Sequence, residues 1–416
     1  MTGWLLLILG LLSAASVANA RWPRRSLLLV MPSWFGAFIA VELAVHLLAL
    51  SAALVVLLVL LGALDTTVGW IGLALWAIAA LGSLPWGAAS LRTRISVDGR
   101  PEDLDLSSDA PRIPWYLLLV PLAGLWRPGV RYERGVVYRE VDGIRLRLDI
   151  VRPKRDPGRP LPAIIHVHGG AWFFGSRKEQ GWPLLNHLAA NGWVGFNINY
   201  RLSPHATLPE HVEDVKYAIA WVREHAEELG VDPEFIAITG GSAGGHLTAL
   251  AALTADDRSL QPGFEDADTH VQAAVPFYGI YDMTDPEREH LKPLRQIVEW
   301  IVMKARIDRE PEKFRAMSPI HRVHPDAPPF FIIHGDGDTL VPVGESRRFS
   351  KRLREVSRQP VLYAEMPGGQ HAFDVFPTWR SAPVIRAVER FLHATYATRR
   401  KGAEATERAA GDALTA

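Results

Sequence analysis

Residues 235–253 read FIAITGGSAGGHLTALAAL, a short apolar run that meets a helical pattern at a glycine-rich turn around Ser242. The run FIAIT predicts a buried strand, and residues 245–253 predict a helix. The turn fits the pattern G-x-S-x-G, whose strand–turn–helix setting lifts the serine Oγ above a sheet. Close packing leaves room only for glycine at 240 and 244, and the helix N-terminus favours developing negative charge. We therefore predict that Ser242 is a nucleophile; a plain glycine-rich turn is the alternative.

The sequence on both sides of this turn alternates between strand and helix patterns, without an internal repeat. The expected strands are residues 139–151, 163–167, 194–200, 235–239, 273–277, 330–333 and 361–365, and the expected helices are 211–229, 245–253 and 383–396. Short apolar strands separated by helices imply parallel βαβ units. The predicted fold class is therefore α/β, with a doubly wound, mostly parallel sheet.

A nucleophilic serine needs a base, and the base needs a carboxylate to orient it. His371 stands in the glycine-rich stretch PGGQHAF, which follows the last expected strand, and we predict that it is the base. The stretch HGDGDTLVP offers two aspartates after the strand at 330–333. Asp338 lies farther out on this loop and is the predicted acid, while Asp336 is expected to hold the turn.

The oxyanion of an ester's tetrahedral intermediate needs two or more N–H donors. The motif HGGAW at residues 168–172 follows a strand, so its glycines bring backbone N–H groups close to a substrate. We predict the donors to be Gly169, Gly170 and Ala243, with Ala171 as a further candidate. His168 is expected to organise the loop, and a simple β-turn is the alternative for the motif.

The same loop and a later segment are expected to shape the substrate pocket. Trp172 and Phe173 are predicted to wall it, and residues 280–326, which separate two strands, are predicted to cap it. Structural packing is an equal alternative for both.

The motifs HGGAW, GGSAGG, HGDGDTLVP and GGQHAF occur in this order, with YRLSP at residues 200–204 and Leu208-Pro209 between the first two. Over residues 131–396 the chain resembles the α/β-hydrolase superfamily. More narrowly it is similar to the carboxylesterases related to hormone-sensitive lipase and to the bacterial feruloyl-esterase-like group. The resemblance implies that Ser242, Asp338 and His371 form the triad and that Gly169 and Gly170 form the oxyanion loop. Relatives of hormone-sensitive lipase usually have an acidic residue before the serine; here Gly241 favours the feruloyl-esterase-like branch.

Composition excludes several other classes. The 416 residues carry 45 Lys and Arg and 45 Asp and Glu, so no basic excess favours nucleic-acid binding. The absence of cysteine excludes disulfides, thiolate zinc sites and a cysteine nucleophile. Charge is uneven, because residues 1–90 contain only three basic and two acidic residues. This indicates a membrane region at residues 1–90 before a soluble domain.

Three apolar runs within this region predict about three transmembrane helices: residues 4–20, 35–64 and 68–88. Ala18-Asn19-Ala20 also resembles a signal-peptidase site, so the first run is either a retained span or a cleaved signal. In a three-span chain the basic flanks Arg21, Arg24, Arg25, Arg92 and Arg94 fall on one side. Since basic flanks stay in the cytoplasm, we predict a multi-pass protein of the cell membrane with a cytoplasmic catalytic domain.

Glu42 and His46 stand four residues apart on one helical face of the second run. They either lie near the lipid headgroups or have a function in the span. Residues 91–130 are predicted to be a linker, within which the apolar segment 114–126 suits a helix at the membrane surface. The catalytic domain is expected at residues 131–397, and a disordered tail at 398–416.

These features predict a membrane-anchored serine hydrolase that cleaves carboxylic esters through an acyl-enzyme. The reaction needs no metal or cofactor, and the expected partners are a small-molecule or lipid acyl ester and the bilayer, without nucleic acid. The alternatives are an arylformamidase-like amide hydrolase, a serine peptidase, or a catalytically silent hydrolase fold that binds ligands. The peptidase is disfavoured because peptidases of this fold usually carry a propeller domain, for which the chain has no room.

Overall fold

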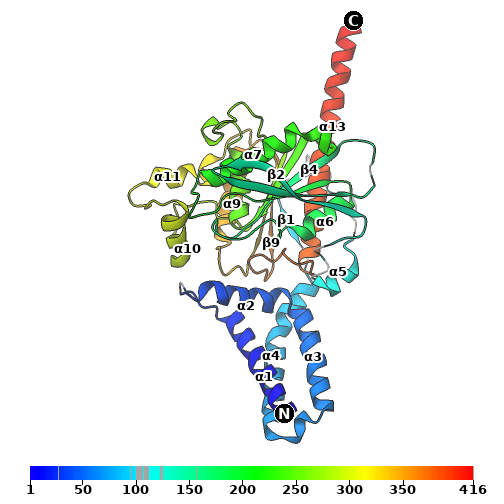
Figure 1. The fold of residues 1–416 in the computed structure, drawn as a ribbon, viewed down its shortest axis with the longest axis vertical. Helices are drawn as coiled ribbons and strands as arrows, with labels where there is room; N and C mark the ends of the chain where they lie inside the picture. Colours follow the sequence, from blue (N-terminus) through cyan, green and yellow to red (C-terminus); the bar gives the residue numbers. More distant parts are fainter. Residues whose placement is uncertain are drawn as a thin grey trace.

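The computed structural model describes residues 1–26, 28–93, 95–99, 106, 112–121, 124, 126–155 and 157–415, with side chains given up to 402 and for 404. Four apolar helices lie at one end of the molecule and an α/β domain lies at the other (Figure 1). The last helix, α13, extends away from the domain on the side opposite to the apolar helices.

A nine-stranded sheet forms the centre of the α/β domain, in the order β1-β9-β8-β7-β6-β4-β5-β3-β2. Its strands are β1 (Ser96–Asp98), β2 (Val130–Val141), β3 (Ile144–Pro153), β4 (Leu161–Val167), β5 (Val194–Ile198), β6 (Val231–Gly241), β7 (Ala273–Phe277), β8 (Phe330–Gly335) and β9 (Val361–Met366). Strands β4 to β9 pair in parallel, and the outer strands β1, β2 and β3 pair antiparallel. The predicted doubly wound, mostly parallel sheet is confirmed.

Helices cover both faces of the sheet because neighbouring residues of its inner strands point to opposite faces. Ile236 and Ile238 belong to the hydrophobic core on one face, and Phe235 and Ala237 to the core on the other. The first core includes α7 (Glu210–Glu224), α8 (Ala226–Leu229), α9 (Ala243–Leu253) and α12 (Gly344–Val356), and the second includes α6 (Trp182–Ala190) and α13 (Ser381–Thr415).

The strand order changes direction beside β4. The chain leaves β4 for β5 on one side and later returns to β6 on the other side. Ligands of open α/β sheets bind at such a point, outside the carboxyl ends of the strands. HGGAW follows β4 and Ser242 follows β6, so both motifs lie at this point.

One expected strand is wrong. Residues 139–151 form no single strand, because β2 ends at Val141 and β3 begins at Ile144. Asp142 and Gly143 both have positive φ, 51° and 73°, so they form a two-residue hairpin turn. The dipeptide Asp-Gly between two alternating runs was the signal for this turn.

The apolar helices are α1 (Thr2–Arg21), α2 (Val30–Glu42), α3 (Ala44–Leu60) and α4 (Thr67–Leu91), with the short helix η1 (Ala63–Asp65) before α4. By length and composition α1 and α4 can cross a membrane, and the bent pair α2 and α3 can supply a third span. The run 35–64 is therefore not one straight helix, since α2 and α3 meet at an angle of 81°. Helix α2 lies across the top of the other three, against the domain (Figure 1).

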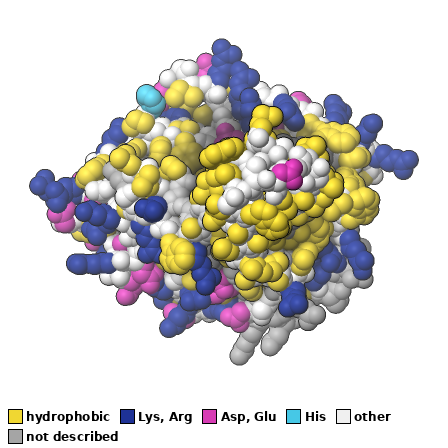
Figure 2. All heavy atoms as spheres, turned by 90° about the horizontal axis from the view of Figure 1, so that it is seen from below, with side chains coloured by type: hydrophobic (Ala, Val, Ile, Leu, Met, Phe, Trp, Pro, Cys, Tyr) yellow, Lys and Arg dark blue, Asp and Glu magenta, His cyan; other side chains and the backbone are white. Residues whose placement is uncertain are grey.

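The surface of this helical end is mostly hydrophobic, with Lys and Arg side chains around it (Figure 2). Large side chains that are more than half exposed there include Trp4, Leu12, Leu60, Ile78 and Leu81. An apolar surface of this extent on a chain with an otherwise charged domain is typical of contact with lipid.

The remaining elements are short helices: α5 (Trp115–Leu119), η3 (Arg258–Leu260), α10 (Lys292–Ile297), η4 (Val298–Val302), α11 (Pro311–Ala316) and η5 (Pro319–Arg322). Helix α5 occupies part of the expected surface segment 114–126. Of the expected linker, residues 94, 100–105, 107–111, 122, 123 and 125 lie outside the described residues.

The C-terminal segment differs from the expected disordered tail. Helix α13 does not end near Tyr396 but continues to Thr415. Residues 397–415 are rich in Ala, Glu and Arg, which have high helix propensity, so the polar composition is also compatible with a helix.

Candidate active site

Ser242 lies in a sharp turn between β6 and α9. Its backbone has φ 58° and ψ −121°, a strained conformation, and its N–H donates to the Phe277 carbonyl at 3.0 Å. A Cβ atom on Gly240 would lie 2.5 Å from the Val167 carbonyl oxygen, and one on Gly244 would lie 2.0 Å from the same oxygen. Packing therefore requires glycine at both positions, as the sequence predicted.

His371 and Asp338 come together from the loops after β9 and β8. His371 Nδ1 lies 2.6 Å from Asp338 Oδ2, and both side chains are almost fully buried. Burial alone would raise the pKa of Asp338, but the charge of His371 and hydrogen bonds from His334 and His371 outweigh it and hold this pKa below its ordinary range. The carboxylate is thus charged and fixes the orientation of the His371 ring.

Asp336 does not contact His371. Its Oδ1 accepts a hydrogen bond from the Gly368 N–H at 2.5 Å, which ties the two loops together at the surface. Asp338 Oδ1 instead accepts from the N–H groups of Leu340 and Val341, at 2.8 and 2.9 Å. The two aspartates therefore differ in place: Asp338 meets His371, and Asp336 joins the loop after β8 to the loop after β9.

Ser242 and His371 line one pocket, whose other walls are mainly apolar. Its lining residues are Val30, Met31, Trp34, Gly170, Ala171, Trp172, Phe174, Gln180, Ser242, Tyr278, Ile280, Leu291, Pro293, Leu294, Ile297, Leu340, Val341, His371 and Ala372. Both Ser242 and His371 are described residues, and the structure has no hydrogen bond between their side chains. Such bonds are often long in a free enzyme and shorten when substrate binds.

The loop after β4 differs from its prediction in one donor. The Gly169 N–H donates to Gln180 Oε1 at 2.8 Å, so this group is already engaged within the protein. Gly170 lines the pocket with φ 123°, and a Cβ atom there would lie 2.0 Å from the Phe174 carbonyl oxygen. Ala243 opens α9, where the first N–H groups have no partner inside the helix. Gly170 and Ala243 remain the candidate donors, with Ala171 beside them.

The aromatic wall of the pocket differs from the predicted one by one residue. Trp172 lines the pocket, but Phe174 rather than Phe173 is the second aromatic residue that this loop contributes. Ala171 and Trp172 both have positive φ, which turns the chain so that alternation along it cannot be assumed. From the expected cap, residues of α10 and Ile280 line the pocket.

Tyr278 explains why glycine precedes the serine. A Cβ atom on Gly241 would lie 2.6 Å from Tyr278 Oη, so an acidic side chain does not fit between them. The Tyr278 ring packs 4.7 Å from the His371 ring, and its hydroxyl donates to the partly buried Asp374. Sequence reasoning missed Tyr278, because nothing in the local pattern links it to Gly241.

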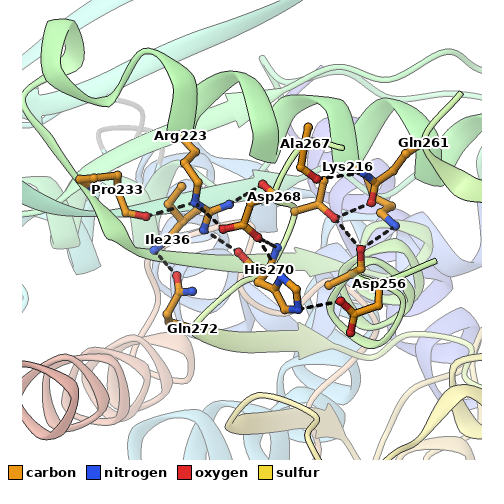
Figure 3. Close-up of polar contacts among 12 residues, drawn as sticks. Lys216, Arg223, Pro233, Ile236, Asp256, Gln261, Ala267, Asp268, His270 and Gln272 are labelled. Atoms are coloured by element: carbon orange, nitrogen blue, oxygen red, sulfur yellow. Dashed lines mark hydrogen bonds and ion pairs between the residues drawn. The ribbon is translucent and has the colours of Figure 1, made fainter. Parts of the chain in front are cut away.

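Two other histidines show why position decides the role. His168 is buried, its Nδ1 lies 2.8 Å from the Gly169 carbonyl oxygen, and burial lowers its pKa to about 4. His270 lies at the surface between Asp268 and Asp256, at 2.8 and 3.2 Å (Figure 3). With a carboxylate on each ring nitrogen, His270 has no nitrogen left to serve a nucleophile.

Glu42 is bound to residues far along the chain, which neither of the two expectations for it specified. Its carboxylate is fully buried, 3.0 Å from Arg380 Nε, and accepts the Gln370 N–H at 2.7 Å. His46 Nε2 lies 2.6 Å from the Leu118 carbonyl oxygen, and its ring packs 5.1 Å from Trp379. These contacts with the α/β domain could not be found from the spacing of two ionisable residues.

Within the described part of the chain, no group of three or more His, Asp or Glu side chains is arranged to hold a metal ion.

Comparison with known proteins finds carboxylic ester hydrolases and esterases. The BD-FAE family model matches residues 148–353. Probable carboxylic ester hydrolase LipM of Mycobacterium tuberculosis is 49% identical over 61% of this chain and 59% of its own length. Esterase LipC of the same organism is 43% identical over 75% of both chains. The apo form of Thermogutta terrifontis esterase 2 matches with a TM-score of 0.51 and 30% identity, over 63% of this chain and 92% of that chain. The match to LipM thus spans less than two thirds of that relative.

Proposed function

Since the chain belongs to the α/β-hydrolase family of carboxylic ester hydrolases, we propose that it is a membrane-associated serine esterase that acts through an acyl-enzyme. One observation carries the proposal. Ser242 and His371 line the same apolar pocket, and His371 Nδ1 is held 2.6 Å from a buried carboxylate. This leaves His371 Nε2 to take a proton from the serine.

In the first half-reaction Ser242 Oγ attacks the ester carbonyl carbon, and His371 Nε2 takes the hydroxyl proton. The negative charge that forms on the carbonyl oxygen is stabilised by N–H groups of Gly170 and Ala243; one such donor contributes about 3 kcal/mol. The C–O bond to the alcohol then breaks, and His371 returns the proton to the leaving oxygen.

In the second half-reaction water attacks the acyl-serine carbon, and His371 Nε2 takes a proton from this water. The intermediate collapses with release of the carboxylic acid, and the proton passes to Ser242 Oγ. Asp338 stays ionised throughout and stabilises the histidinium that forms in each step. The substrate is a small-molecule or lipid ester with apolar substituents, because the pocket walls are mainly apolar.

We further propose that α1, α3 and α4 cross the membrane and that the catalytic domain faces the cytoplasm. Arg21 ends α1 and Arg92 follows α4, both toward the domain, while the link between α3 and α4 has no Lys or Arg. A retained α1 is supported by its packing on α4. A Cβ atom on Gly10 would lie 2.4 Å from the Gly72 carbonyl oxygen, and such small-residue contacts are typical of helix pairs in membranes.

The test is hydrolysis of p-nitrophenyl esters together with labelling by a fluorophosphonate. Ser242→Ala should abolish both while the protein stays folded, whereas Ser259→Ala, at an exposed serine, should change neither. Labelling of the folded Ser242→Ala variant at the wild-type rate would contradict the assignment. A protein that is labelled but cleaves only formanilides or peptides would favour the amide-cleaving alternatives, and no labelling at all would favour a silent binding fold.

A further inference from the structure

Helix α2 is packed as part of the α/β domain although its sequence belongs to the apolar N-terminal region. Phe38 belongs to the domain's second hydrophobic core and stacks on Phe376, with ring centroids 5.8 Å apart. Trp34 and Ile39 pack against the same core. In Figure 1, α2 lies between the other apolar helices and the domain. The helix is thus placed to reach both the membrane and the active site.

At the end of α2, Glu42 is bound to the loop that carries the candidate base. Glu42 Oε1 accepts the N–H of Gln370, the residue before His371, at 2.7 Å. Its partner Arg380 also donates to the Pro367 carbonyl at the start of this loop. The Glu42 and Arg380 side chains are both fully buried. Each end of the short loop is therefore fixed to one ion pair, which joins α2 to the residue before α13.

Gln370 passes this constraint to both catalytic loops. Its Oε1 accepts hydrogen bonds from the His371 N–H at 2.9 Å, the Thr339 N–H at 2.9 Å and the Thr339 hydroxyl at 3.0 Å. Thr339 follows Asp338, so one buried amide joins the acid loop to the base loop. Because Glu42 holds the backbone of Gln370, it acts on the distance between His371 and Asp338 without touching either.

The first turns of α2 cover the histidine side of the pocket. Val30, Met31 and Trp34 line it, and the Trp34 ring meets the His371 ring edge-on with centroids 6.0 Å apart. His371 must return its proton to the leaving oxygen, so the alcohol part of an ester lies on the same side of Ser242 as this ring. The α2 wall therefore faces the alcohol part rather than the acyl part.

From this arrangement we propose that α2 is a functional part of the active site. Glu42 is a positioning residue that sets the His371 loop, and the Val30–Trp34 turn selects esters whose leaving alcohol is apolar. This inference rests on the proposed esterase function and adds to it the substrate class and the role of the N-terminal region.

The wall is tested with two ester series measured on the full-length protein in detergent micelles. One series varies the alcohol, ethyl against hexyl acetate, followed by acid release; the other varies the acyl group on p-nitrophenol. Trp34→Ala should lower the hexyl-to-ethyl ratio of kcat/KM about tenfold, as expected for loss of a large apolar contact. Met31→Ala should lower it in the same direction, Trp34→Phe should restore most of it, and the acyl-series ratio should change less than the alcohol-series ratio.

Phe35→Ala is the matched control for the wall. Phe35 is the next residue on α2, is 56% exposed and does not line the pocket. It should leave the hexyl-to-ethyl ratio at the wild-type value. An unchanged ratio in both Trp34→Ala and Met31→Ala, an equal change in Phe35→Ala, or a change confined to the acyl series would overturn the alcohol-side assignment.

Glu42 is tested against a second buried glutamate that makes no contact with the catalytic loops. Glu389 is 1% exposed and pairs with His187 at 2.7 Å, so Glu389→Gln makes the same chemical change elsewhere in the core. Glu42→Gln should lower kcat at least about tenfold with little change in KM, as expected for a misplaced catalytic group. Glu389→Gln should lower the melting temperature but not kcat per folded molecule.

Glu42→Asp keeps the charge and gives a second variant if Glu42→Gln does not fold. Its kcat should be lower than that of wild type and higher than that of a folded Glu42→Gln variant. Wild-type kcat in a folded Glu42→Gln or Glu42→Asp variant would refute the positioning role. An equal loss of kcat in Glu389→Gln would refute it too. Failure of the esterase proposal itself would appear differently, as ester hydrolysis that survives Ser242→Ala.

Discussion

Replacing Asp338 with Asn tests the candidate triad at the residue whose contacts are best defined. Asp338 Oδ1 accepts two backbone N–H groups, and Oδ2 faces His371 Nδ1 and His334 Nε2. An asparagine that keeps its oxygen on the backbone side must turn its NH₂ group toward His371. Since NH₂ only donates, His371 Nδ1 must then accept, and the ring proton moves to Nε2. In that tautomer Nε2 cannot take the proton of Ser242.

The opposite rotamer of this asparagine is disfavoured by the same contacts. It would set NH₂ against the N–H groups of Leu340 and Val341, and each buried donor left without an acceptor costs about 1–3 kcal/mol. In the preferred rotamer NH₂ also faces His334 Nε2, whose N–H keeps the Val341 carbonyl as its acceptor, so the inactive tautomer is favoured by less than the full cost of two unpaired donors. Together with the loss of charge beside the histidinium, we expect kcat to fall about 10⁴-fold, or ~5.5 kcal/mol in the activation free energy.

The assay is kcat and KM for a p-nitrophenyl ester, with folding checked by circular dichroism and thermal unfolding. Asp336→Asn is the control, because Asp336 accepts one surface hydrogen bond from the Gly368 N–H. The kcat of this variant should stay within about threefold of wild type, and its free energy of unfolding should fall by at most ~1 kcal/mol. A folded Asp338→Asn variant that keeps kcat within tenfold of wild type would refute the tautomer argument. A larger loss in Asp336→Asn would exchange the two roles.

The same substitution changes the acid stability of the protein. The pKa of Asp338 is lowered in the folded state, chiefly by His371 and His334 acting against burial. The stability that this carboxylate contributes is therefore complete above about pH 4 and is lost as the pH falls toward the folded-state pKa. Between about pH 4 and pH 2 the unfolding free energy should fall less steeply in Asp338→Asn than in wild type.

Three further predictions follow from other parts of the structure. Gly241→Asp should destabilise the fold by about 1–3 kcal/mol in thermal unfolding, because its side chain overlaps Tyr278, and wild-type stability would show that this contact does not exclude an acidic residue. Gln180→Ala should lower kcat more than it raises KM, because the Gly169 N–H loses the acceptor that holds the loop; a rise in KM alone would assign Gln180 to substrate binding instead. Since the chain has no cysteine, Ser259→Cys and Asp65→Cys each introduce a single site for labelling. In intact cells a membrane-impermeant maleimide should react with the cysteine at position 65 and not with the one at position 259. The reverse result would place the catalytic domain outside the cell.

Most of the layout of the candidate site could be predicted because it depends on local chemistry. A strand, a glycine-rich turn and a helix follow each other within residues 235–253, so Ser242 could be placed by sequence alone. Asp338 and His371 each follow a parallel strand, and the carboxyl ends of parallel strands meet at one edge of the sheet. Topology brings such residues together whatever the side chains between them are.

The errors came from contacts between segments distant in the chain and from tight turns. The Gly169 N–H is engaged by Gln180, 11 residues away, and no pattern in HGGAW shows that an acceptor will arrive there. Phe174 replaces Phe173 in the pocket because successive residues of the loop have positive φ, which breaks the alternation used to assign sides. The hairpin at Asp142-Gly143, in contrast, could have been predicted from the sequence, because Asp-Gly between two alternating runs is typical of such a turn.

Glu42 shows what composition alone leaves open. In a run of apolar residues a single acid suggests contact with headgroups, because an isolated charge is costly in hydrocarbon. Its partners, Arg380 and the Gln370 N–H, lie more than 320 residues later, so only the folded chain shows that the charge is paired. A buried pair of this kind adds little net stability compared with apolar packing, yet removal of one partner costs about 3–5 kcal/mol. Such a pair fixes the position of its neighbours more than it strengthens the fold. Its place between α2 and the loop of His371 agrees with the positioning role that we propose for Glu42.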